Sequence, residues 1–282
     1  MEQSKTIEFV KLDDIMQYLE SVDREETGED TFEWLEENGE EIHAIRANDM
    51  VVGLAIIVDD VEGFLYVYIF PAQRNKGYGK LAVDAAEQRM IGASAKSVHT
   101  AWLNGDEKAL RFAERNGYKR THASAFMAYH GKAFPEEDLP IRHYRDEDYP
   151  EAFRMYAEAF HVMRLSTGWF PDSAVRQPSE EERRYWAEHA DDGYVYLSGS
   201  EIVGHARIEG PELDVVSIKI PHQGKGLGRK FVTYLTNRIL EKGEGEPVLW
   251  CVVGNDKARA LYDSLGYEEV CRNDFAVKKL GK

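Results

Sequence analysis

Two short segments combine glycine with basic residues at a spacing that suits the binding of an anion. They are residues 74–80, RNKGYGK, and residues 223–229, QGKGLGR. Each follows an apolar run and precedes a stretch with helical periodicity, so unpaired backbone N–H groups would stand at the positive end of a helix dipole. Glycine suits this position because a Cβ would hold the backbone away from phosphate oxygens. A tight helix start without a ligand is the alternative interpretation.

Other phosphate-binding and metal-binding patterns fit poorly. The chain has no Gly-x-x-x-x-Gly-Lys-Ser/Thr motif, which excludes a P-loop, and neither segment extends to Gly-x-Gly-x-x-Gly. The flanking strands look antiparallel, which disfavours a dinucleotide-binding fold. Cys251 and Cys271 are the only cysteines, and no Cys-x-x-Cys or Cys/His cluster indicates a metal. We therefore expect a ligand that carries phosphate, and no metal.

The two segments belong to an internal repeat. Positions 74, 77, 79 and 117 correspond to positions 223, 226, 228 and 266, and every pair is 149 residues apart. Four landmarks in one register indicate a tandem duplication. With 282 residues, the chain has the length of two domains of roughly 100–150 residues each. We expect domains at residues 1–134 and 140–282, joined near Phe134–Pro140, where two prolines flank acidic residues.

Each copy has the periodicity of a mixed α/β domain. In the first copy, strands are expected at Ile7–Val10, Ile42–Ala47, Met50–Asp59, Gly63–Phe70, Val98–Trp102 and Ser124–His130, and helices at Leu12–Ser21, Thr31–Asn38, Gly77–Ile91 and Asp106–Arg115. In the second copy, strands are expected at Ile141–His143, Tyr194–Leu197, Glu201–Glu209, Leu213–Ile220, Val248–Val253 and Phe275–Leu280, and helices at Tyr149–His161, Ser179–Ala190, Gly226–Lys242 and Asp256–Leu265. Ser179 is the expected N-cap of its helix.

Acidic residues are concentrated near the N-terminus. The formal net charge is −16, and residues 1–62 account for −15 of it, with 19 Asp and Glu against 4 Lys and Arg. This balance argues against a nucleic-acid partner, which requires a basic surface. Within Glu20–Glu41, eleven acids face the single Arg24. They suit either a solvated helical face or hairpin, or an electrostatic funnel for a cationic substrate.

Composition and the N-terminal residues give the expected location. The chain is 43% hydrophobic and 30% charged, as globular proteins that fold in water are. The longest apolar run, Val51–Val58, falls short of the ~18–20 residues of a membrane span. The first residues lack the apolar segment of a secretory signal. A cytoplasmic protein without a membrane partner is expected.

The order of these features resembles the GNAT acyltransferase superfamily. Arg/Gln-x-x-Gly-x-Gly follows a fourth strand and opens a helix in both copies, and the second copy adds the strand 248–253 (VLWCVV), Asn255, the segment 258–262 (ARALY) and the turn 265–267 (LGY). The resemblance covers residues 194–280 and about 42–130. It implies two tandem domains of class α/β (α+β). Each would be a mixed, mostly antiparallel sheet with helices on both faces and a splay between the fourth and fifth strands.

The resemblance implies acetyl-CoA as cofactor. Its pantetheine arm would lie in the splay along Ser217–Ile220, and its pyrophosphate on the amides of the glycine loop. In the second copy the implied cofactor-binding residues are Ile218, Ile220, Gln223, Gly224, Lys225, Gly226, Leu227, Gly228, Arg229 and Asn255, and in the first copy they are Arg74, Lys76, Gly77, Gly79 and Lys80. Lys225 and Arg229 would add positive charge. Asn255 would bind the pantetheine arm, cap the following helix, or do both.

The reaction implied by the resemblance is the attack of an amine on the thioester. The ammonium must lose a proton, the carbonyl must be polarised, and the departing thiolate must be protonated. Tyr262 falls at the family's general-acid position, with a core or CoA-stacking tyrosine as the alternative. A backbone N–H of the splayed strand would polarise the carbonyl. Glu212 and Asp214, two apart on one face of a strand, are candidate bases or else solvated strand-edge acids.

The two copies are predicted to differ. At the offset of 149 residues, Tyr262 corresponds to Ala113, which cannot donate a proton, and Asn255 corresponds to Asp106. Phe112, beside Ala113, is expected in the core. We expect catalysis in the second copy, with the first copy as a scaffold, a regulatory CoA site or part of the acceptor pocket. A working first site that uses another, water-mediated acid is the rival interpretation.

The function expected from the resemblance is the transfer of an acetyl group from acetyl-CoA to a primary amine, either a small cationic amine or a peptide amine. Transfer from another acyl-CoA and a non-catalytic acyl-CoA sensor are the alternatives. The acceptor would lie over the loop His161–Pro171, where Trp169 and Phe170 either line a pocket or belong to the core. A monomer or a homodimer is expected.

Overall fold

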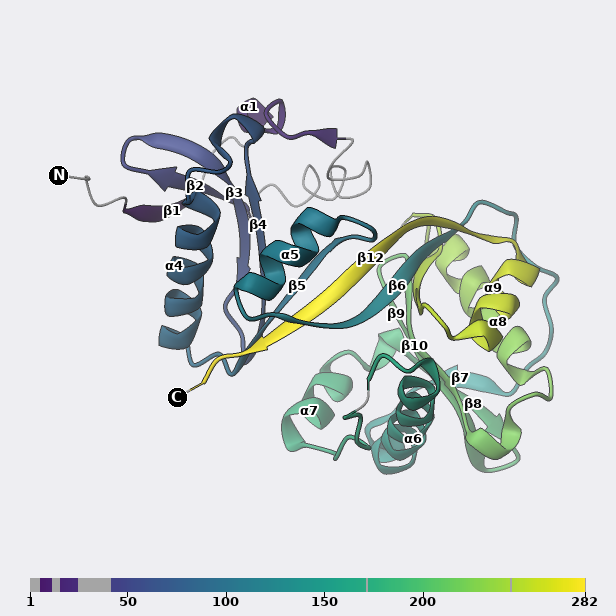
Figure 1. Ribbon diagram of the computed structural model, residues 1–282. Coiled ribbons are helices and arrows are strands. Elements are labelled where there is room, and N and C mark those ends of the chain that lie inside the picture. The colour runs from purple at the N-terminus through teal and green to yellow at the C-terminus, as the bar shows by residue number, and fades with distance from the viewer. Residues whose placement is uncertain (1–5, 12–15, 25–41, 171, 244, 282) are drawn as a thin grey trace. The chain divides into compact units, whose positions relative to one another are not determined.

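The polypeptide forms two compact units, each built around its own arrangement of β-strands (Figure 1). The computed structural model describes residues 6–11, 16–24, 42–170, 172–243 and 245–281. Unit 1 comprises residues 1–123 and 271–282, and unit 2 comprises residues 124–270. Each unit contains one of the two glycine segments.

The strands of unit 1 lie in the order β1-β2-β3-β4-β5-β12. They are β1 (Ile7–Lys11), β2 (Ile42–Ala47), β3 (Met50–Val58), β4 (Glu62–Ile69), β5 (Ser97–Leu103) and the second half of β12 (Tyr267–Lys279). β4 and β5 pair in parallel, whereas β1 with β2, β2 with β3, β3 with β4, and β5 with β12 pair antiparallel. The helices described in this unit are α1 (Met16–Leu19), α4 (Tyr78–Gly92) and α5 (Glu107–Arg115).

The strands of unit 2 lie in the order β6-β11-β10-β9-β8-β7. They are the second half of β6 (Lys119–Tyr129), β7 (Ile141–His143), β8 (Gly193–Ser198), β9 (Glu201–Glu209), β10 (Glu212–Ile218) and β11 (Val248–Val252). β10 and β11 pair in parallel, and the other pairs of neighbours are antiparallel. Its helices are α6 (Tyr149–Thr167), α7 (Glu180–Glu188), α8 (Leu227–Lys242) and α9 (Asp256–Leu265).

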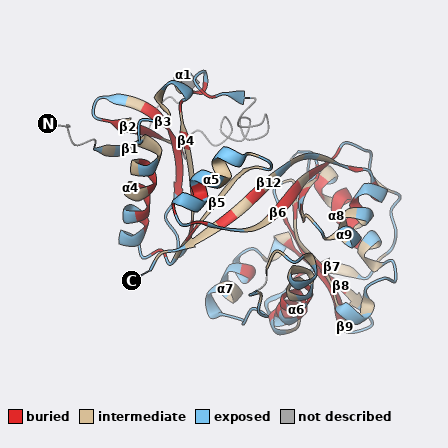
Figure 2. Cartoon of the chain, in the orientation of Figure 1, coloured by how far each residue is buried: buried red, intermediate tan, exposed pale blue. Residues whose placement is uncertain are grey.

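Two apolar cores cover the two faces of the unit 2 sheet. On one face, α8 and α9 bury residues at helical spacing, among them Phe231, Leu235 and Ile239, against the strands. On the other face, α6 and α7 bury Phe153 and Trp186. Figure 2 shows buried residues along the strands and exposed residues on the outer sides of the helices. The predicted mixed, mostly antiparallel sheet with helices on both faces is confirmed.

The last strands of the two sequence repeats are exchanged between the compact units. Residues 124–128 of β6, at the end of the first repeat, pair with β11 in unit 2. Residues 273–279 of β12, at the end of the second repeat, pair with β5 in unit 1. Within unit 1, Arg120 of β6 forms an ion pair with Asp274 of β12, and the Thr121 hydroxyl donates to the Phe275 carbonyl. The compact units therefore differ from the sequence repeats by these two strand halves.

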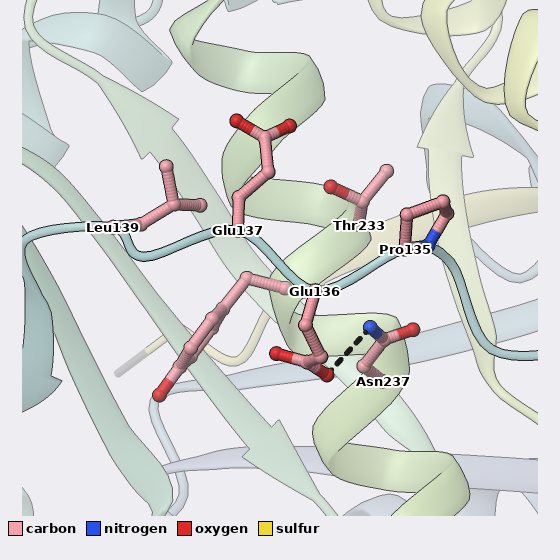
Figure 3. Close-up of a pocket in the computed structure, with 7 residues that line it drawn as sticks. Pro135, Glu136, Glu137, Leu139, Thr233 and Asn237 are labelled. Carbon is pink, nitrogen blue, oxygen red and sulfur yellow. Dashed lines mark hydrogen bonds between the residues drawn. The ribbon is translucent and has the colours of Figure 1, made fainter.

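The connector between the repeats, residues 134–140, lies on α8 (Figure 3). The buried Asn237 side chain accepts from the Phe134 N–H at 2.8 Å and donates to the Phe134 carbonyl and the Glu136 carboxylate, each at 3.0 Å. Lys230 and Arg238 of α8 form ion pairs with Glu137 and Glu136. The small pocket in Figure 3 is lined by Pro135, Glu136, Glu137, Leu139, Thr233, Tyr234 and Asn237. The connector thus has fixed polar contacts with unit 2.

Most predicted helices and strands are confirmed within a few residues, with three exceptions. β6 and β12 begin at Lys119 and Tyr267, five and eight residues before the predicted strands, because these long strands pair with distant segments of the chain that local periodicity does not reveal. α6 runs to Thr167 rather than to His161, because no helix breaker precedes Gly168, which ends it with φ 73°. Ser179 is confirmed as an N-cap, since its hydroxyl accepts from the Glu182 N–H. The expectation that Phe112 is core is wrong, because its side chain is 38% exposed.

Some expectations fall on residues that the structure does not describe. The predicted helix Thr31–Asn38 and most of the acidic segment Glu20–Glu41 lie outside the described residues. Of the predicted helix Leu12–Ser21, the described part is helical at Met16–Leu19.

Candidate active site

The parallel strands at the centre of each unit separate toward their carboxyl ends. β10 pairs with β11 at one position, Glu212 with Val248, and β4 pairs with β5 at three positions, from Glu62 to Phe64. Beyond these pairs the facing backbone edges have no partner strand among the described residues, which leaves their N–H and C=O groups available. The predicted splay between the fourth and fifth strands is confirmed in both units.

The glycine loop of unit 2 lies directly after the splayed strand β10. A 3-10 turn at Ile220–His222 leads to Gly224 at φ 72° and to Gly226 at φ 82°, which is the N-cap of α8. An added Cβ at either glycine would have no atom within 4 Å, so the loop is open on its outer side. The first N–H groups of α8 face this space without a side-chain cap, which is the arrangement of an anion site. Ile220, expected on the strand, lies in the 3-10 turn.

The loop of unit 1 has the same backbone. Gly77 is the N-cap of α4 at φ 86°, and Asn75 takes the place of Gly224 with φ 59°. The Arg74 Nε donates to the Ile69 carbonyl at 2.8 Å, and in unit 2 the Gln223 Nε2 donates to the Ile218 carbonyl at 2.9 Å. The first side chain of each motif therefore ties the loop to the end of its strand.

The last glycine of each motif serves helix packing. An added Cβ at Gly228 would lie 3.5 Å from Leu261 Cδ2 of α9, and one at Gly79 would lie 3.1 Å from Phe112 Cζ of α5. The partly exposed Phe112 ring thus covers Gly79. Glycine at this position lets the helix approach its neighbour closely.

The basic residues of the two loops have different partners. In unit 1, Lys80 forms an ion pair with Asp84, and the Lys76 Nζ donates to the Ala72 carbonyl at 2.8 Å. In unit 2, Arg229 donates to the Ser264 hydroxyl, and Lys225 forms no ion pair with a described residue. The loop of unit 2 therefore leaves more of its positive charge for an anion.

Asn255 and its counterpart Asp106 begin equivalent helices with different side-chain roles. The Asp106 carboxylate accepts from the N–H groups of Lys108 at 2.8 Å and Ala109 at 3.0 Å, so it is used as a cap. The half-buried Asn255 side chain makes no capping hydrogen bond. Its amide is therefore available to a ligand in the splay.

Tyr262 lies on the inner face of α9 and is 8% exposed, as is Ala113 on α5. Its ring centroid lies 5.9 Å from that of Tyr267, and it packs in the same core as Cys251. Burial raises the pKa of the Tyr262 hydroxyl above its ordinary value, and Cys251 and Tyr267 add smaller contributions. The hydroxyl therefore carries its proton at neutral pH, as a general acid must.

A β-bulge interrupts β10 inside the splay. Asp214 pairs with Arg207 of β9 and Ser217 pairs with His205, so two residues of β10 oppose one of β9. Val215 lies in the bulge with φ 47°, a strained value for a β-branched residue. The bulge turns backbone N–H groups out of the regular ladder, where one can meet a ligand.

β4 of unit 1 has no bulge, since it pairs with β3 in one unbroken register from Phe64 to Ile69. Because β10 holds one additional residue, the offset between the copies is 149 residues after the bulge and 148 before it. In the aligned sheets, Glu212 therefore corresponds to Phe64 and Asp214 to Tyr66. Unit 1 thus lacks both the bulge and the carboxylates.

Glu212 and Asp214 lie together at the beginning of β10. Burial raises the pKa of Glu212 to about 7, with contributions from the negative charges of Asp214 and Glu209. Burial also raises the pKa of Asp214. The Val215 N–H donates to the Asp214 carboxylate and acts in the opposite direction, lowering that pKa. A carboxyl group that titrates near neutral pH suits a general base.

Sequence reasoning missed three residues next to these carboxylates. Arg207 of β9 is buried, lies opposite Asp214 and contacts Glu209 and Tyr185. A charged residue within the apolar run of residues 202–208 was the available signal. Nothing in the sequence marked the bulge at Val215, because the change of offset between the copies is visible only in the strand registers.

The expected acceptor region lies at the end of α6. An added Cβ at Gly254, before α9, would lie 3.7 Å from Thr167, so this end of α6 borders the splay of unit 2. Trp169 and Phe170 are half-buried, which fits neither a closed core nor a free surface. The Arg164 guanidinium lies 5.7 Å from the centre of the Phe170 ring.

Within the described residues, no helix combines the length and apolar character needed to cross a membrane. The same part of the chain holds no group of three or more His, Cys, Asp or Glu side chains arranged for a metal ion.

Two protein-family models match the chain, one in each half. The Acetyltransferase (GNAT) family matches residues 10–118, and the FR47-like protein family matches residues 201–276. The mycothiol acetyltransferase of Corynebacterium efficiens is 26% identical over 218 residues, which cover 71% of this chain and 69% of that protein. The mycothiol acetyltransferase of Corynebacterium glutamicum is 24% identical over 241 residues, 79% of this chain and 77% of that protein.

Solved structures share the fold. A GCN5-related N-acetyltransferase from Sphaerobacter thermophilus matches with a TM-score of 0.64 at 19% identity, over 93% of this chain and 89% of that one. A tandem GNAT protein from the clavulanic acid biosynthesis pathway matches with a TM-score of 0.53 at 15% identity, over 98% of this chain and 99% of that one. Each half of the chain contains a GNAT-type region, and each unit contains a sheet whose central parallel strands splay apart beside a glycine loop. The chain therefore belongs to the GNAT N-acetyltransferases as a tandem member.

Proposed function

We propose that this acetyltransferase transfers an acetyl group from acetyl-CoA to a primary amine, and that the reaction takes place in unit 2. One observation carries the proposal. The bulge, Glu212 and Tyr262 occur together in the same unit, around the splayed strand β10. In unit 1 the corresponding places hold a regular strand, Phe64 and Ala113.

The cofactor would lie along the free edge of β10. The open loop from Gln223 to Arg229 would hold the pyrophosphate with its backbone amides, and Lys225 would add positive charge. The Ser217 and Ile218 edge and the uncapped Asn255 amide would bind the pantetheine arm. The empty space beside Gly224 and Gly226 and the Asn255 side chain, which makes no capping hydrogen bond, support the fit of acetyl-CoA at this site.

The residues of unit 2 supply the three tasks of the reaction. Acetyl-CoA contributes a thioester, whose acyl carbon forms a bond with the amine nitrogen as the carbon–sulfur bond breaks. Glu212 accepts the proton of the attacking amine, and Asp214 is held by the Val215 N–H and adds negative charge beside it. A backbone N–H of the bulge stabilises the negative charge that develops on the carbonyl oxygen. Tyr262 gives its proton to the departing sulfur.

Unit 1 would bind CoA without turning it over. Its loop keeps the backbone of unit 2, with Gly77 at the helix start, Arg74 on the strand end, and Lys76, Gly79 and Lys80 in place. Asp106 is used as a cap, and its negative charge opposes a phosphorylated ligand. A site in unit 1 that works through a water-mediated acid is the rival proposal.

The acceptor would be an amine that approaches from the side of Glu212 and the end of α6. The carboxylates of Glu209, Glu212 and Asp214 favour a cationic acceptor, small or peptidic. The relatives named mycothiol acetyltransferase add the acceptor of those enzymes as a second candidate.

The test measures thiol release from acetyl-CoA with a panel of amines that includes peptides, diamines and the acceptor of the mycothiol enzymes. Calorimetry with CoA gives the number of binding sites. Amine-dependent thiol release that Glu212→Gln abolishes supports the proposal. Tight binding of CoA without thiol release from any amine or acyl-CoA would instead identify a non-catalytic sensor.

A further inference from the structure

Charged side chains occupy every second position on the face of the unit 2 sheet that α7 covers. They are Arg207 and Glu209 of β9 and Glu212 and Asp214 of β10. The alternation of a strand places these four side chains on one face. Cross-strand pairing sets Asp214 opposite Arg207 and Glu212 opposite Glu209.

Arg207 is the buried cation of this face, with a side chain that is 5% exposed. Its Nη2 lies 2.8 Å from the Glu209 carboxylate and donates to the Tyr185 hydroxyl at 3.4 Å. Its guanidinium lies 4.7 Å from the centre of the Tyr185 ring, and its buried Nε has no hydrogen-bond partner among the described residues. The Tyr185 hydroxyl donates to Glu209 at 3.2 Å. These three residues form a closed set, here named the Arg207 cluster.

The three carboxylates of this face are not equivalent. Glu209 is held by Arg207 and Tyr185, and Asp214 accepts from the Val215 N–H and faces Arg207. The Glu212 carboxylate forms no hydrogen bond or ion pair with the described residues, although its backbone belongs to the sheet. Of the three, Glu212 is therefore the carboxylate that can exchange a proton with a ligand.

Two charged groups act on Glu212 directly, Asp214 of its own strand β10 and Glu209 of β9, whereas its paired residue on β11, Val248, is uncharged. Arg207 of β9 and Tyr185 of α7 contact Glu209 and act on Glu212 through it. Burial raises the pKa of Glu212, and the charges of Asp214 and Glu209 raise it further. The fixed position of Glu209 thus bears directly on the protonation of Glu212.

Unit 1 replaces the whole set. At the places of Arg207 and Glu209, β3 has Ile56 and Val58, which pair with Tyr66 and Phe64 of β4. The charged face and the bulge are therefore absent together from the unit to which we assign no catalysis. The glycine loop and the packing of α4 against α5 are kept in unit 1, so among the described residues the difference between the units is concentrated on the charged face and the bulge.

We propose that the Arg207 cluster is a positioning device. It fixes the negative charge of Glu209 next to Glu212 and so sets the pH range in which Glu212 accepts the proton of the amine. The proposal rests on the proposed function, in which Glu212 is the base. Tyr185, Arg207 and Glu209 act through Glu212, and the structure gives them no contact with the reacting atoms.

The kinetic test compares the pH dependence of kcat/KM for one amine in the wild type and in Glu209→Gln, Arg207→Gln and Glu268→Gln. The acid limb of this profile reports the base of the free enzyme. Glu209→Gln removes a negative charge and should move the midpoint of the limb to lower pH by about one pH unit. Arg207→Gln removes the cation that compensates the charge of Glu209 and should move the midpoint of the acid limb to higher pH. Glu268, an exposed carboxylate of β12, is the matched control and should leave it unchanged.

The second test needs no turnover. Carbon-13 NMR of glutamate carboxyl groups, with the Glu212 signal assigned by its loss in Glu212→Gln, follows the titration of Glu212 in each protein. We expect a midpoint near pH 7 in the wild type, a lower one in Glu209→Gln and a higher one in Arg207→Gln. Because Arg207 is buried, its variant is compared only if its circular dichroism matches the wild type. Glu209, whose side chain is 47% exposed, decides the question alone.

The two tests separate the two proposals. A Glu212 midpoint that Glu209→Gln leaves unchanged overturns the positioning role, whatever the protein acetylates. A midpoint that moves as expected in a protein that releases no thiol with any amine supports the control of Glu212 titration by Glu209 and contradicts the proposed function. A limb that moves equally in Glu268→Gln also overturns the proposal, because the effect would then be one of net charge.

Discussion

At the scale of the residue, the two units differ in a few side chains at equivalent places. Tyr262 and Ala113 lie on the inner faces of α9 and α5 with the same exposed fraction, 8%, so the site of unit 1 has the place for an acid but no group that can donate a proton. Glu212 and Phe64 occupy the same position of the splayed strand. Changes at these positions should therefore alter chemistry more than folding.

Tyr262→Phe should lower kcat and leave CoA affinity within about threefold. The substitution removes one hydroxyl that bonds no described residue and keeps the ring in its core. Loss of a general acid costs ~10²–10⁴-fold in proton transfer, and nearer tenfold for a good leaving group such as a thiolate. The measurement is single-turnover thiol release together with CoA calorimetry.

The matched control is Tyr267→Phe, in the same core. The Tyr267 hydroxyl shares a 2.7 Å hydrogen bond with Thr236, so this variant should lose about 1 kcal/mol of unfolding free energy and keep its kcat. Ala113→Tyr should add no activity, because Phe64 and a regular strand remain in unit 1. If Tyr262→Phe retains full kcat when chemistry limits the rate, Tyr262 is structural.

Glu212 should also make the stability of the protein depend on pH. Its pKa is about 7 in the folded protein against 4.5 in the unfolded chain. A raised folded pKa means that the folded state favours the proton, so the contribution of Glu212 is complete below pH 4.5 and is lost as the pH rises through 7. Glu212→Gln should therefore be at least as stable as the wild type at pH 8 and gain nothing at pH 4.5. Thermal melts across this range measure the difference, and parallel curves for the two proteins would contradict the prediction.

At the scale of the element, the proposed anion site would be made by the beginning of a helix rather than by a side chain. Gly226 and Gly77 cap α8 and α4 in the same left-handed conformation, with open space where a Cβ would be. The motif therefore has three separate duties. Its first residue ties the loop to the strand, its middle glycine turns the chain, and its last glycine admits the neighbouring helix.

Gly226→Glu should abolish CoA binding in unit 2 and all turnover, because a carboxylate would stand where we propose that the phosphates bind. Gly77→Glu introduces the same charge and a similar backbone strain in unit 1, and it should leave most of the activity. Gly226→Ala separates strain from charge, since the left-handed conformation costs a non-glycine residue about 1–2 kcal/mol. Calorimetric stoichiometry and thiol release measure these effects, and normal turnover of Gly226→Glu would refute the assignment of the reaction to unit 2.

At the scale of the whole molecule, neither sequence repeat contains all the strands of one unit. Unit 1 needs residues 273–279 of β12, which pair with β5, and Lys278 of that segment forms an ion pair with the buried Glu87 of α4. Unit 2 needs residues 124–128 of β6 beside β11. The stability of each unit thus depends on residues from the end of the other repeat.

Truncation after Val270 should destabilise unit 1 more than unit 2. It removes the strand beside β5 and leaves the Glu87 carboxylate buried without its cation, which is strongly unfavourable. Hydrogen exchange should lose protection in β5 and α4 and keep it in α8. Truncation after Leu280, which keeps every β5 pair, is the control. Greater loss of protection in unit 2 would contradict this prediction.

Features set by short stretches of chain could be predicted from the sequence. The glycine turns, the N-cap at Ser179 and most helix and strand positions depend on neighbours within one or two turns, so local periodicity and turn chemistry determine them. The duplication, and with it the contrast between Tyr262 and Ala113, followed from comparing the chain with itself. Phe112 was misassigned because burial depends on what covers a helix face, which its own sequence does not state.

Features set by contacts between distant segments required the tertiary structure. The bulge at Val215 depends on the register of β10 against β9, and the exchange of β6 and β12 depends on which of two equivalent strand edges each one joins. The burial of Glu212, together with the nearby charges of Asp214 and Glu209, raises its pKa to about 7. The sequence shows only that two acidic residues lie on one strand. The sequence determined which groups are present and how the backbone turns near them. The tertiary structure determined which charges lie together and how far water is excluded, because both depend on packing between residues far apart in the chain.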